Sequence, residues 1–387
     1  MNPAGARPVW ADINLDAIAH NAGVMAKLAA PAALCAVVKA DAYGHGAVAA
    51  SRAALAGGAS WLAVASTEEA EPLRQAGIAT AILVLSEPPP AAMADVVALG
   101  LTPTVYSEQG VEAAAKAAAE RRSRDPRYRL AVHLKVDTGM HRVGIAPEAA
   151  VGLALAIDHQ DELSLEGIFT HLAVADEPAD SANATQLDAF DRVVDALSGQ
   201  GIRPSLVHAC NSAATMAFPA ARHDLVRCGI TLYGVTPAAA PAAALNLRSC
   251  LDLRPALSLR ARVGHLTSVE TGGGVSYGHR HRCSGPTTVA TVPIGYADGV
   301  RWGLGCGRGD VLIGGRRYPI AGRVTMDQLM VDLGDDHLVM VGDEVVLLGC
   351  QGAEMIGAWE WADRLGTIPY EILCGIGPRV RRVAVGV

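Results

Sequence analysis

Lysine and aromatic residues are scarce in this chain of 387 residues. Aromatic residues make up 4% of the sequence and hydrophobic residues 51%, so a core has to be built from Ala, Val, Leu and Ile, which suits layered strands and helices. Lysine occurs only at positions 27, 39, 116 and 135, although the basic residues number 32. Lys27 and Lys116 lie in Ala-rich helical stretches. Lys39 and Lys135 lie at strongly apolar, strand-like runs, where the presence of a charged side chain needs an explanation.

Several other features are missing. No apolar run reaches the length of a membrane span, and the first ten residues lack the apolar core of a signal peptide, so we expect a cytosolic protein without membrane contact. A net charge of −7 and the absence of a basic cluster argue against nucleic-acid binding. The eight cysteines are scattered without a C-x-x-C pair, which indicates reduced thiols. The histidine spacing predicts no metal site.

Short β-type runs alternate with helical stretches through the first two thirds of the chain. This alternation requires parallel strands joined by crossover helices. Eight such units in roughly 210 residues match a TIM-type (β/α)8 barrel better than a doubly wound sheet, which stays open as the alternative. The eight runs are Leu34–Val38, Trp61–Val64, Ala81–Leu85, Leu101–Val105, Leu130–Val136, Leu165–Thr170, Leu206–His208 and Leu225–Cys228.

After about Asn246 the pattern changes to short alternating runs separated by Gly-rich turns, which predicts an antiparallel β domain. We therefore expect an α/β chain with a (β/α)8 barrel over residues 1–246 and a C-terminal antiparallel β domain over residues 247–387. The first dozen or so residues are expected to pack with the β domain. The alternating runs include Leu257–Thr267, Thr287–Pro293 and Glu344–Leu348.

Polar side chains follow the predicted barrel strands, at the face where catalytic groups of such barrels lie. Lys39 follows an apolar run, and partial desolvation favours the neutral amine that forms Schiff bases; an ion pair with Asp41 explains its position equally well. Lys135 shares a strand face with Asp137, and an ion pair between the two inside the barrel is the simpler explanation of its position. Arg227 falls in a buried strand end, where an arginine must be paired, and a structural ion pair is the alternative.

The ends of the last two predicted strands offer groups that bind phosphate. Asn211 and Ser212 begin a helical stretch, and Gly229 and Ile230 follow the last strand, so a hydroxyl and backbone N–H groups are available there. Barrels often hold phosphate at this place. An ordinary helix cap explains the first pair equally well, and a tight turn explains Gly229.

Nine motifs, in order along the chain, resemble those of alanine racemase. The resemblance covers essentially the whole sequence, and the family fold is a (β/α)8 barrel with a C-terminal β domain. The motifs are Lys39-Ala-Asp-Ala-Tyr43-Gly-His-Gly, Lys135-Val-Asp-Thr-Gly-Met-His-Arg142, Phe169-Thr-His171, His208-Ala-Cys-Asn211-Ser212, Val226-Arg227-Cys-Gly-Ile, Val275-Ser-Tyr277-Gly, Pro293-Ile-Gly-Tyr296-Ala-Asp-Gly, Gly322-Arg-Val-Thr325-Met326-Asp327 and Ile368-Pro-Tyr370-Glu.

The resemblance implies a pyridoxal-phosphate-dependent racemase with two bases on opposite faces of the substrate Cα. Lys39 would carry the cofactor and handle the proton on the D-alanine face. Tyr277, supplied by the other subunit, would handle the L face. Arg227 would face the pyridine nitrogen of the cofactor, and His171 would orient Arg227 and Tyr277. Arg142 would meet the cofactor phenolate oxygen and the substrate carboxylate.

The resemblance also implies a homodimer, because no single subunit completes the site. Met326 of the partner subunit would contact the substrate carboxylate through its backbone, and Tyr296 and Asp327 would line the entrance. Lys135 matches a position that is carbamylated in many members, where the resulting anion would orient Arg142. The remaining residues implied to bind the cofactor, mainly its phosphate, are Tyr43, Asn211, Ser212, Gly229, Ile230 and Tyr370.

The implied activity supplies D-alanine for cell-wall peptidoglycan. A broader amino-acid racemase, for example one accepting serine, stays open, because a hydrophobic pocket discriminates weakly against one added hydroxyl. A non-catalytic pyridoxal-phosphate carrier would need neither Tyr277 nor a β domain, and a decarboxylase would be expected to place a carboxylate where Arg227 lies. Many relatives have Cys where this chain has Thr325, and we expect that difference to affect the entrance rather than the chemistry.

Overall fold

The computed structural model describes residues 7–237 and 251–386, which form two compact units. The first, here called the barrel, comprises Ala17–Ala42 and Ala47–Arg254. The second, here called the β domain, comprises the N-terminal segment through Asp16, the short segment Tyr43–Gly46 and the chain from Pro255 onward. The predicted boundary between residues 246 and 247 lies outside the described residues and stays a prediction.

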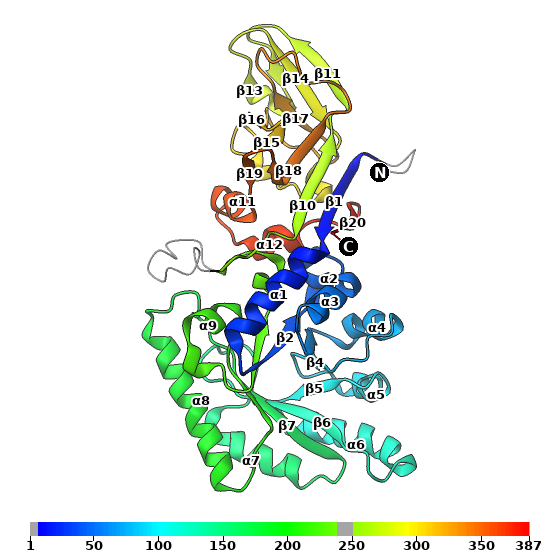
Figure 1. Cartoon of the computed structure of the whole chain (residues 1–387), viewed down its shortest axis with the longest axis vertical. Coiled ribbons are helices and arrows are strands. Elements are labelled where there is room, and N and C mark those ends of the chain that lie inside the picture. Colours follow the sequence, from blue (N-terminus) through cyan, green and yellow to red (C-terminus); the bar gives the residue numbers. More distant parts are fainter. Residues whose placement is uncertain (1–6, 238–250, 387) are drawn as a thin grey trace. The chain divides into compact units, whose positions relative to one another are not determined.

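Eight parallel strands form the barrel, in the order β8-β7-β6-β5-β4-β3-β2-β9 (Figure 1). The two end strands meet through backbone hydrogen bonds, from Arg227 N to Cys210 O at 2.9 Å and from Asp224 N to Val207 O at 3.0 Å, so the barrel is nearly closed. This confirms the barrel prediction. The strands are β2 (Ala33–Val37), β3 (Trp61–Val64), β4 (Ile82–Val84), β5 (Thr102–Val105), β6 (Leu130–Lys135), β7 (Leu163–Phe169), β8 (Leu206–His208) and β9 (Leu225–Cys228).

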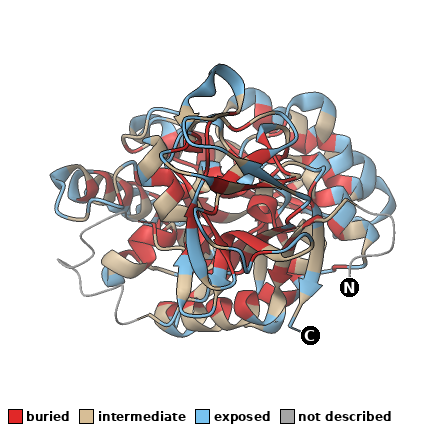
Figure 2. Ribbon diagram, turned by 90° about the horizontal axis from the view of Figure 1, so that it is seen from above, coloured by how far each residue is buried: buried red, intermediate tan, exposed pale blue. Residues whose placement is uncertain are grey.

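The helices of the barrel are rich in alanine, and their buried positions recur at helical spacing. Figure 2 shows buried residues on one side of these helices and exposed residues on the other. Side-chain caps begin three of them, in which Ser107 accepts from Gly110 N in α6, Asp180 accepts from Ala182 N in α8, and Asn211 accepts from Ala214 N in α9. The helices are α1 (Leu15–Ala29), α3 (Ala47–Ala56), α4 (Thr67–Gln75), α5 (Met93–Ala98), α6 (Glu108–Arg124), α7 (Pro147–Asp158), α8 (Ser181–Gly199) and α9 (Ser212–Ala217).

The short helical segment α2 (Lys39–Gly44) has an unusual backbone. Ala40, Asp41, Ala42 and Tyr43 have φ values of 52–55°, so the turn is left-handed, a conformation that costs L-residues roughly 1–2 kcal/mol each. Tertiary contacts hold it in place: Ala40 N donates to Glu69 Oε1 at 2.8 Å, and Ala47 N donates to Asp41 Oδ1 at 2.7 Å. Lys39 therefore begins a strained turn rather than ending a strand.

The main sheet of the β domain has the strand order β16-β15-β18-β10-β1-β20, with β19 paired to β18. Most pairs are antiparallel, as predicted, but the N-terminal strand β1 runs parallel to the C-terminal strand β20. The first strand thus lies between β10 and β20. The strands are β1 (Val9–Asn14), β10 (Leu257–Arg262), β15 (Asp310–Ile313), β16 (Arg316–Pro319), β18 (Glu344–Gln351), β19 (Glu354–Ile356) and β20 (Arg381–Val385).

Two smaller sheets and two helices complete the β domain. The predicted run over residues 257–267 is broken into β10 and β11 at Val263 and Gly264, and the helices α11 and α12 were not predicted. No helix of residues 7–237 and 251–386 is both long and apolar enough to cross a membrane. The further elements are β11 (His265–Val269), β14 (Thr287–Val292) and β17 (Leu329–Asp332) in one sheet, β12 (Gly274–Val275) and β13 (His281–Arg282) in the other, α11 (Ala358–Leu365) and α12 (Pro369–Cys374).

Candidate active site

Arg227 on β9 is a buried cation surrounded by neutral acceptors. Its Nη1 lies 2.9 Å from His208 Nδ1 and donates to the His208 carbonyl at 3.2 Å. Its Nη2 donates to the carbonyls of Thr170 at 2.7 Å and Ala209 at 3.1 Å, and lies 3.4 Å from His171 Nδ1. Burial lowers the pKa of Arg227 to about 10. No carboxylate of the described residues lies within ion-pair distance, so the alternative of a structural ion pair does not hold.

A chain of two buried histidines continues from Arg227 into the barrel. His208 Nε2 lies 2.9 Å from His133 Nδ1, and His133 Nε2 lies 3.4 Å from Glu166 Oε2. Because His208 Nδ1 accepts from the arginine, we assign the proton of each neutral ring to Nε2. Burial lowers the pKa of both imidazoles, which supports the neutral forms. Gly167 makes room for the second ring, since a Cβ there would lie 2.6 Å from His133 Cε1.

The ring of Phe169, at the end of β7, faces two cations. The Arg227 guanidinium carbon lies 5.0 Å from the ring centroid and Lys135 Nζ lies 5.5 Å from it, distances at which the ring face attracts a cation. His208 stacks on the same ring with a centroid distance of 4.8 Å and an interplanar angle of 8°. The ring thus supplies part of the stabilisation that a carboxylate would otherwise give to these buried cations.

Four predicted site cations act on the imidazole of His171. Burial lowers its pKa to about 3, helped in order by the charges of Arg227, Arg142, Lys135 and Lys39. His171 is therefore a neutral acceptor at physiological pH, as a residue that orients Arg227 must be. Arg142 itself is exposed in the single chain. The barrel gathers an excess of positive charge at the ends of its strands, which is the environment that an anion requires.

Lys135 is a buried amine, and the carboxylate of Asp137, two positions further on, is bonded to backbone N–H groups. Asp137 Oδ1 accepts backbone N–H groups at 3.0–3.1 Å, those of Gly139, Met140 and His141. Burial, with the charges of neighbouring arginines, lowers the pKa of Lys135 to about 8 even though the Asp137 charge acts in the opposite direction. A simple internal pair with Asp137 therefore does not neutralise this lysine.

Ser212 and Gly229 come together at the ends of β8 and β9. The Ser212 hydroxyl oxygen accepts the Gly229 N–H at 3.0 Å and the Thr231 hydroxyl at 3.1 Å. Asn211 Oδ1 accepts the Ala214 N–H at 2.9 Å, so this residue is the cap of α9, as the plainer explanation held. Gly229 precedes a 3₁₀ turn that begins at Ile230. Both helical starts leave N–H groups without intrahelical acceptors.

Two of the predicted phosphate residues lie side by side in the β domain. Tyr43, in the segment Tyr43–Gly46, and Tyr370 on α12 have ring centroids 6.1 Å apart. The segment is fixed by Arg382, whose Nε donates to the Gly44 carbonyl at 2.9 Å. The position of α12 was not predicted, although Pro369 at its first turn is a typical helix start.

Tyr277 stands on a strained turn of the β domain. The preceding Ser276 has φ 63° and ψ −176°, a region used almost only by glycine, while Gly278 has φ 72°. The Ser276 hydroxyl donates to the Arg323 carbonyl at 2.7 Å. Gly322 permits this close approach, because a Cβ there would lie 2.7 Å from Ser276 Cβ. The tyrosine side chain that this turn presents is 70% exposed.

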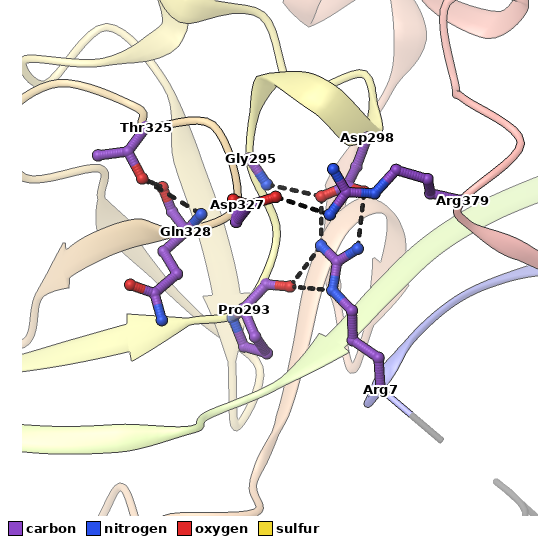
Figure 3. Close-up of polar contacts among 8 residues, drawn as sticks. All are labelled: Arg7, Pro293, Gly295, Asp298, Thr325, Asp327, Gln328 and Arg379. Atoms are coloured by element: carbon purple, nitrogen blue, oxygen red, sulfur yellow. Dashed lines mark hydrogen bonds and ion pairs between the residues drawn. The ribbon is translucent and has the colours of Figure 1, made fainter. Parts of the chain in front are cut away.

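Tyr296 and Met326 lie on two loops that hydrogen-bond to one another. Tyr296 N donates to Thr325 O, and Ala297 N donates to Met326 O, each at 3.0 Å. Thr325 closes its own loop, since its hydroxyl donates to the Gln328 carbonyl at 2.7 Å (Figure 3). Thr325 is therefore used in shaping the loop. Tyr296 and Met326 are 45% and 53% exposed.

The sequence analysis assigned no role to three residues that contact the predicted site. His133 and His208 extend the contacts of Arg227, yet they lie on different strands and no spacing rule joins them. Gln186 on α8 donates to the His171 carbonyl at 3.2 Å and accepts the Ala173 N–H at 2.9 Å. A buried glutamine in the middle of a helix is the only signal that could have identified it.

The chain matches known protein families along most of its length. Residues 13–237 match the family described as alanine racemase, N-terminal domain, and residues 256–384 match alanine racemase, C-terminal domain. It is 43% identical to the alanine racemase of Symbiobacterium thermophilum, over 99% of this chain and 98% of the relative. It is 44% identical to that of Carboxydothermus hydrogenoformans, over 98% of this chain and 100% of the relative.

Solved structures show the same similarity. The crystal structure of alanine racemase from the D-cycloserine-producing Streptomyces lavendulae has a TM-score of 0.90 at 39% identity, covering 98% of each chain. The alanine racemase of Bacillus anthracis with bound L-Ala-P has a TM-score of 0.88 at 38% identity, covering 98% of this chain and 96% of that one.

Proposed function

This chain belongs to the alanine racemase family, and from that premise we propose that it interconverts L- and D-alanine with pyridoxal phosphate and two bases, Lys39 and Tyr277. The observation that carries the proposal is the contact of Arg227 Nη2 with His171 Nδ1 at 3.4 Å, at a site where the charges of Lys39, Lys135 and Arg142 also act on the imidazole. Wild-type activity of this kind would supply D-alanine for peptidoglycan in the cytoplasm. The similar proteins are alanine racemases, which favours alanine over serine as the substrate.

The described residues fit an anionic, aldehyde-bearing cofactor. Lys39 offers a primary amine, which can bind an aldehyde as a Schiff base, and the surrounding cations favour a phosphate-bearing group. Ser212 lies with Gly229 at the ends of β8 and β9, where its hydroxyl oxygen accepts from the Gly229 N–H and the Thr231 hydroxyl, which leaves its own O–H to donate to a ligand. Asn211 supports the same segment as its cap. With Ile230, Tyr43 and Tyr370, these residues would hold the phosphate.

Bound pyridoxal phosphate supplies an electron sink that makes the substrate Cα–H acidic. Arg227 would place a guanidinium at the pyridine nitrogen. Because the guanidinium stays protonated, it would donate a hydrogen bond to that nitrogen without protonating it. The neutral imidazoles of His208 and His171 accept from Arg227. Burial lowers their pKa, so they are weak bases that leave the proton on the guanidinium. The protein thereby limits charge delocalisation, which favours racemisation over side reactions.

Inversion at Cα needs one base on each face. We assign the D-alanine face to Lys39 of the barrel and the L face to Tyr277 of the partner subunit. Tyr277 supports this assignment by standing on a rigid turn with its side chain exposed in the single chain. Met326, Tyr296 and Asp327 would reach the same site from the partner, so the active protein is a homodimer.

Arg142 would bind the cofactor phenolate oxygen and the substrate carboxylate. Its exposure in the single chain is consistent with a group that meets ligands. Lys135 would be carbamylated: its pKa of about 8 leaves part of the amine neutral near physiological pH, and the neutral amine is the form that adds to CO2. The resulting anion would orient Arg142 by a charge-assisted contact.

The test is exchange in D2O. Purified protein supplemented with pyridoxal phosphate is incubated with L-alanine, and D-alanine and Cα deuterium are followed, with L-serine in parallel. We expect labelled D-alanine to form much faster than D-serine. Lys39→Ala should abolish the exchange, whereas Lys116→Ala, on the exposed side of α6, should not. Equal rates for alanine and serine would indicate a broad racemase, and no exchange would contradict the proposed activity.

A further inference from the structure

Asp298 is a fully buried carboxylate in the β domain, with 0% of its side chain exposed. Arg7 holds both of its oxygens, with Nη1 donating to Oδ1 at 2.8 Å and Nη2 donating to Oδ2. The Gly295 N–H donates to Oδ2 at 3.0 Å, and Arg379 Nε lies 3.3 Å from Oδ1. Burial alone would raise the pKa of Asp298, but these hydrogen bonds and charges outweigh it and hold that pKa below its ordinary value.

The same arginine also binds the backbone of the loop that contains Asp298. Arg7 Nε and Nη2 both donate to the Pro293 carbonyl, at 2.9 and 2.7 Å (Figure 3). One guanidinium therefore fixes both ends of the loop over residues 293–298, and Tyr296 lies between those ends. A planar guanidinium that makes several bonds at once fixes direction as well as distance.

This loop is fixed in turn against the loop that contains Met326. A Cβ at Gly295 would lie 2.2 Å from the Thr325 carbonyl oxygen, so the two backbones are in close contact. Arg379 joins the loops a second time, because its Nη2 donates to Asp327 Oδ1 at 2.6 Å. Figure 3 shows the resulting series of contacts from Arg7 through Asp298 and Arg379 to Asp327.

We propose that Arg7, Asp298 and Arg379 are positioning residues that hold the Tyr296 loop and the Met326 loop in one geometry and thereby set the affinity for substrate. None of the three is assigned to the cofactor or to either base. The inference rests on the proposed function, because only that function places these loops beside a substrate. It gives the N-terminal segment, which precedes both the barrel and its chemistry, a part in substrate binding.

The effect should fall on KM rather than on kcat. The Ser276 hydroxyl anchors the turn that presents Tyr277 on the Arg323 carbonyl, three residues before Met326. We expect the loss of Arg7 to loosen the Met326 loop after this anchor, from Thr325 onward, so the second base keeps its position. Losing Arg7 leaves the buried charge of Asp298 without its main partner. We expect the loop over residues 293–298 to move so that this carboxylate reaches water. A displacement of about 1 Å in such supporting residues costs up to about a hundredfold in catalytic efficiency.

The experiment compares Arg7→Met with Arg316→Met in the holoenzyme. Arg316 is the matched control, since it is also a β-domain arginine in a 2.7 Å ion pair, with Asp336, but is 67% exposed and lies on β16. Hydrogen–deuterium exchange is followed for the peptides spanning residues 293–300 and 323–328. For Arg7→Met we expect at least about tenfold faster exchange in both peptides and a KM for alanine raised about tenfold with kcat within about twofold. Arg316→Met should change neither.

A second variant keeps the test decisive if Arg7→Met folds poorly. Arg379→Met removes an arginine that is 45% exposed, so the buried pair of Arg7 and Asp298 stays intact. It should raise KM by about threefold and speed exchange mainly in the 323–328 peptide. Arg7→Lys keeps the charge without the two-pronged contact and should give an intermediate KM.

Unchanged exchange in both peptides, or a fall in kcat with KM unchanged, would overturn the inference. Failure of the proposed function has a different signature, because the parent chain would then racemise no alanine while the exchange rates of the two peptides would still respond to Arg7→Met.

Discussion

In the barrel, Arg227 and Lys135 are buried cations beside neutral imidazoles, whereas in the β domain Tyr277, Tyr296 and Met326 are exposed side chains on tightly bonded turns. Arg227 is 4% exposed and Lys135 is 5% exposed, but Tyr277 is 70% exposed. Burial controls the charge of the barrel residues, since it sets the pKa of each. Backbone geometry controls the β-domain residues, because their turns fix the direction of each side chain.

The difference follows from what each part has to do under the proposed function. A group that binds a permanent anion gains from desolvation, which strengthens every electrostatic contact. A group that enters another subunit's site must be exposed before assembly, so only its turn can be prepared in advance. The strain at Ser276 and the buried Asp298 are such preparations.

The largest expected effect tests the role proposed for the exposed residues of the β domain. Tyr277→Phe removes the hydroxyl of the proposed L-face base but keeps the ring and its turn. We expect alanine racemisation to fall by at least about a hundredfold, the usual contribution of a positioned base. In single-turnover exchange in D2O the loss should be selective for L-alanine. Tyr128→Phe, in the barrel, is the control and should leave both rates unchanged; equal losses for both enantiomers would contradict the two-base assignment.

A second change tests how much the buried cation of the barrel contributes to stability. Arg227→Gln leaves the carbonyls of Thr170, His208 and Ala209 without their donors in a buried site. The free energy of unfolding measured in urea should therefore fall by about 2–4 kcal/mol. Arg124→Gln removes an ion pair with Glu120 that is 79% and 77% exposed, so its cost should stay within about 0.5 kcal/mol. Similar costs for the two variants would mean that burial does not distinguish these arginines.

The smallest effect sharpens the comparison through pH. His133, His171 and His208 have folded-state pKa values below the ordinary value, and that of His171 is about 3. The unfolded chain therefore takes up protons first, and the stability present above about pH 6.5 should be lost as pH falls. Urea unfolding between pH 7 and 5 measures this slope, to which His133 and His208 each contribute up to about 1.4 kcal/mol per pH unit. His208→Asn should reduce the slope, and a flat profile would contradict neutral imidazoles.

The barrel could be predicted because its signal is local. Each apolar run between helical stretches became a strand, and β3 and β9 begin and end where the runs do. The polar residues after those runs could be placed at one face for the same reason, since parallel strands share an end. The motif order supplied the proposed roles, which stay predictions, because Lys39, Arg227 and Tyr277 each lie in a motif of several residues.

The contacts that carry the electrostatics could not be predicted. His133, His208 and Arg227 lie on β6, β8 and β9, and only the barrel register brings them together. Arg7 and Asp298 are separated by 291 positions, and nothing in the sequence near either residue indicates the pair. Such contacts depend on tertiary packing, whereas periodicity reports only which face of an element is buried.

The left-handed turn after Lys39 has a consequence for folding. Alanine and tyrosine disfavour this conformation, so the isolated segment has no reason to adopt it. Its first half is tied to Glu69 in the barrel, and its second half, Tyr43–Gly46, belongs with the β domain and is tied to Arg382. We expect this turn to form only after both units have folded, which pulsed hydrogen exchange at the Ala40 amide would check. A nascent chain would then acquire a correctly presented Lys39 as one of its last events.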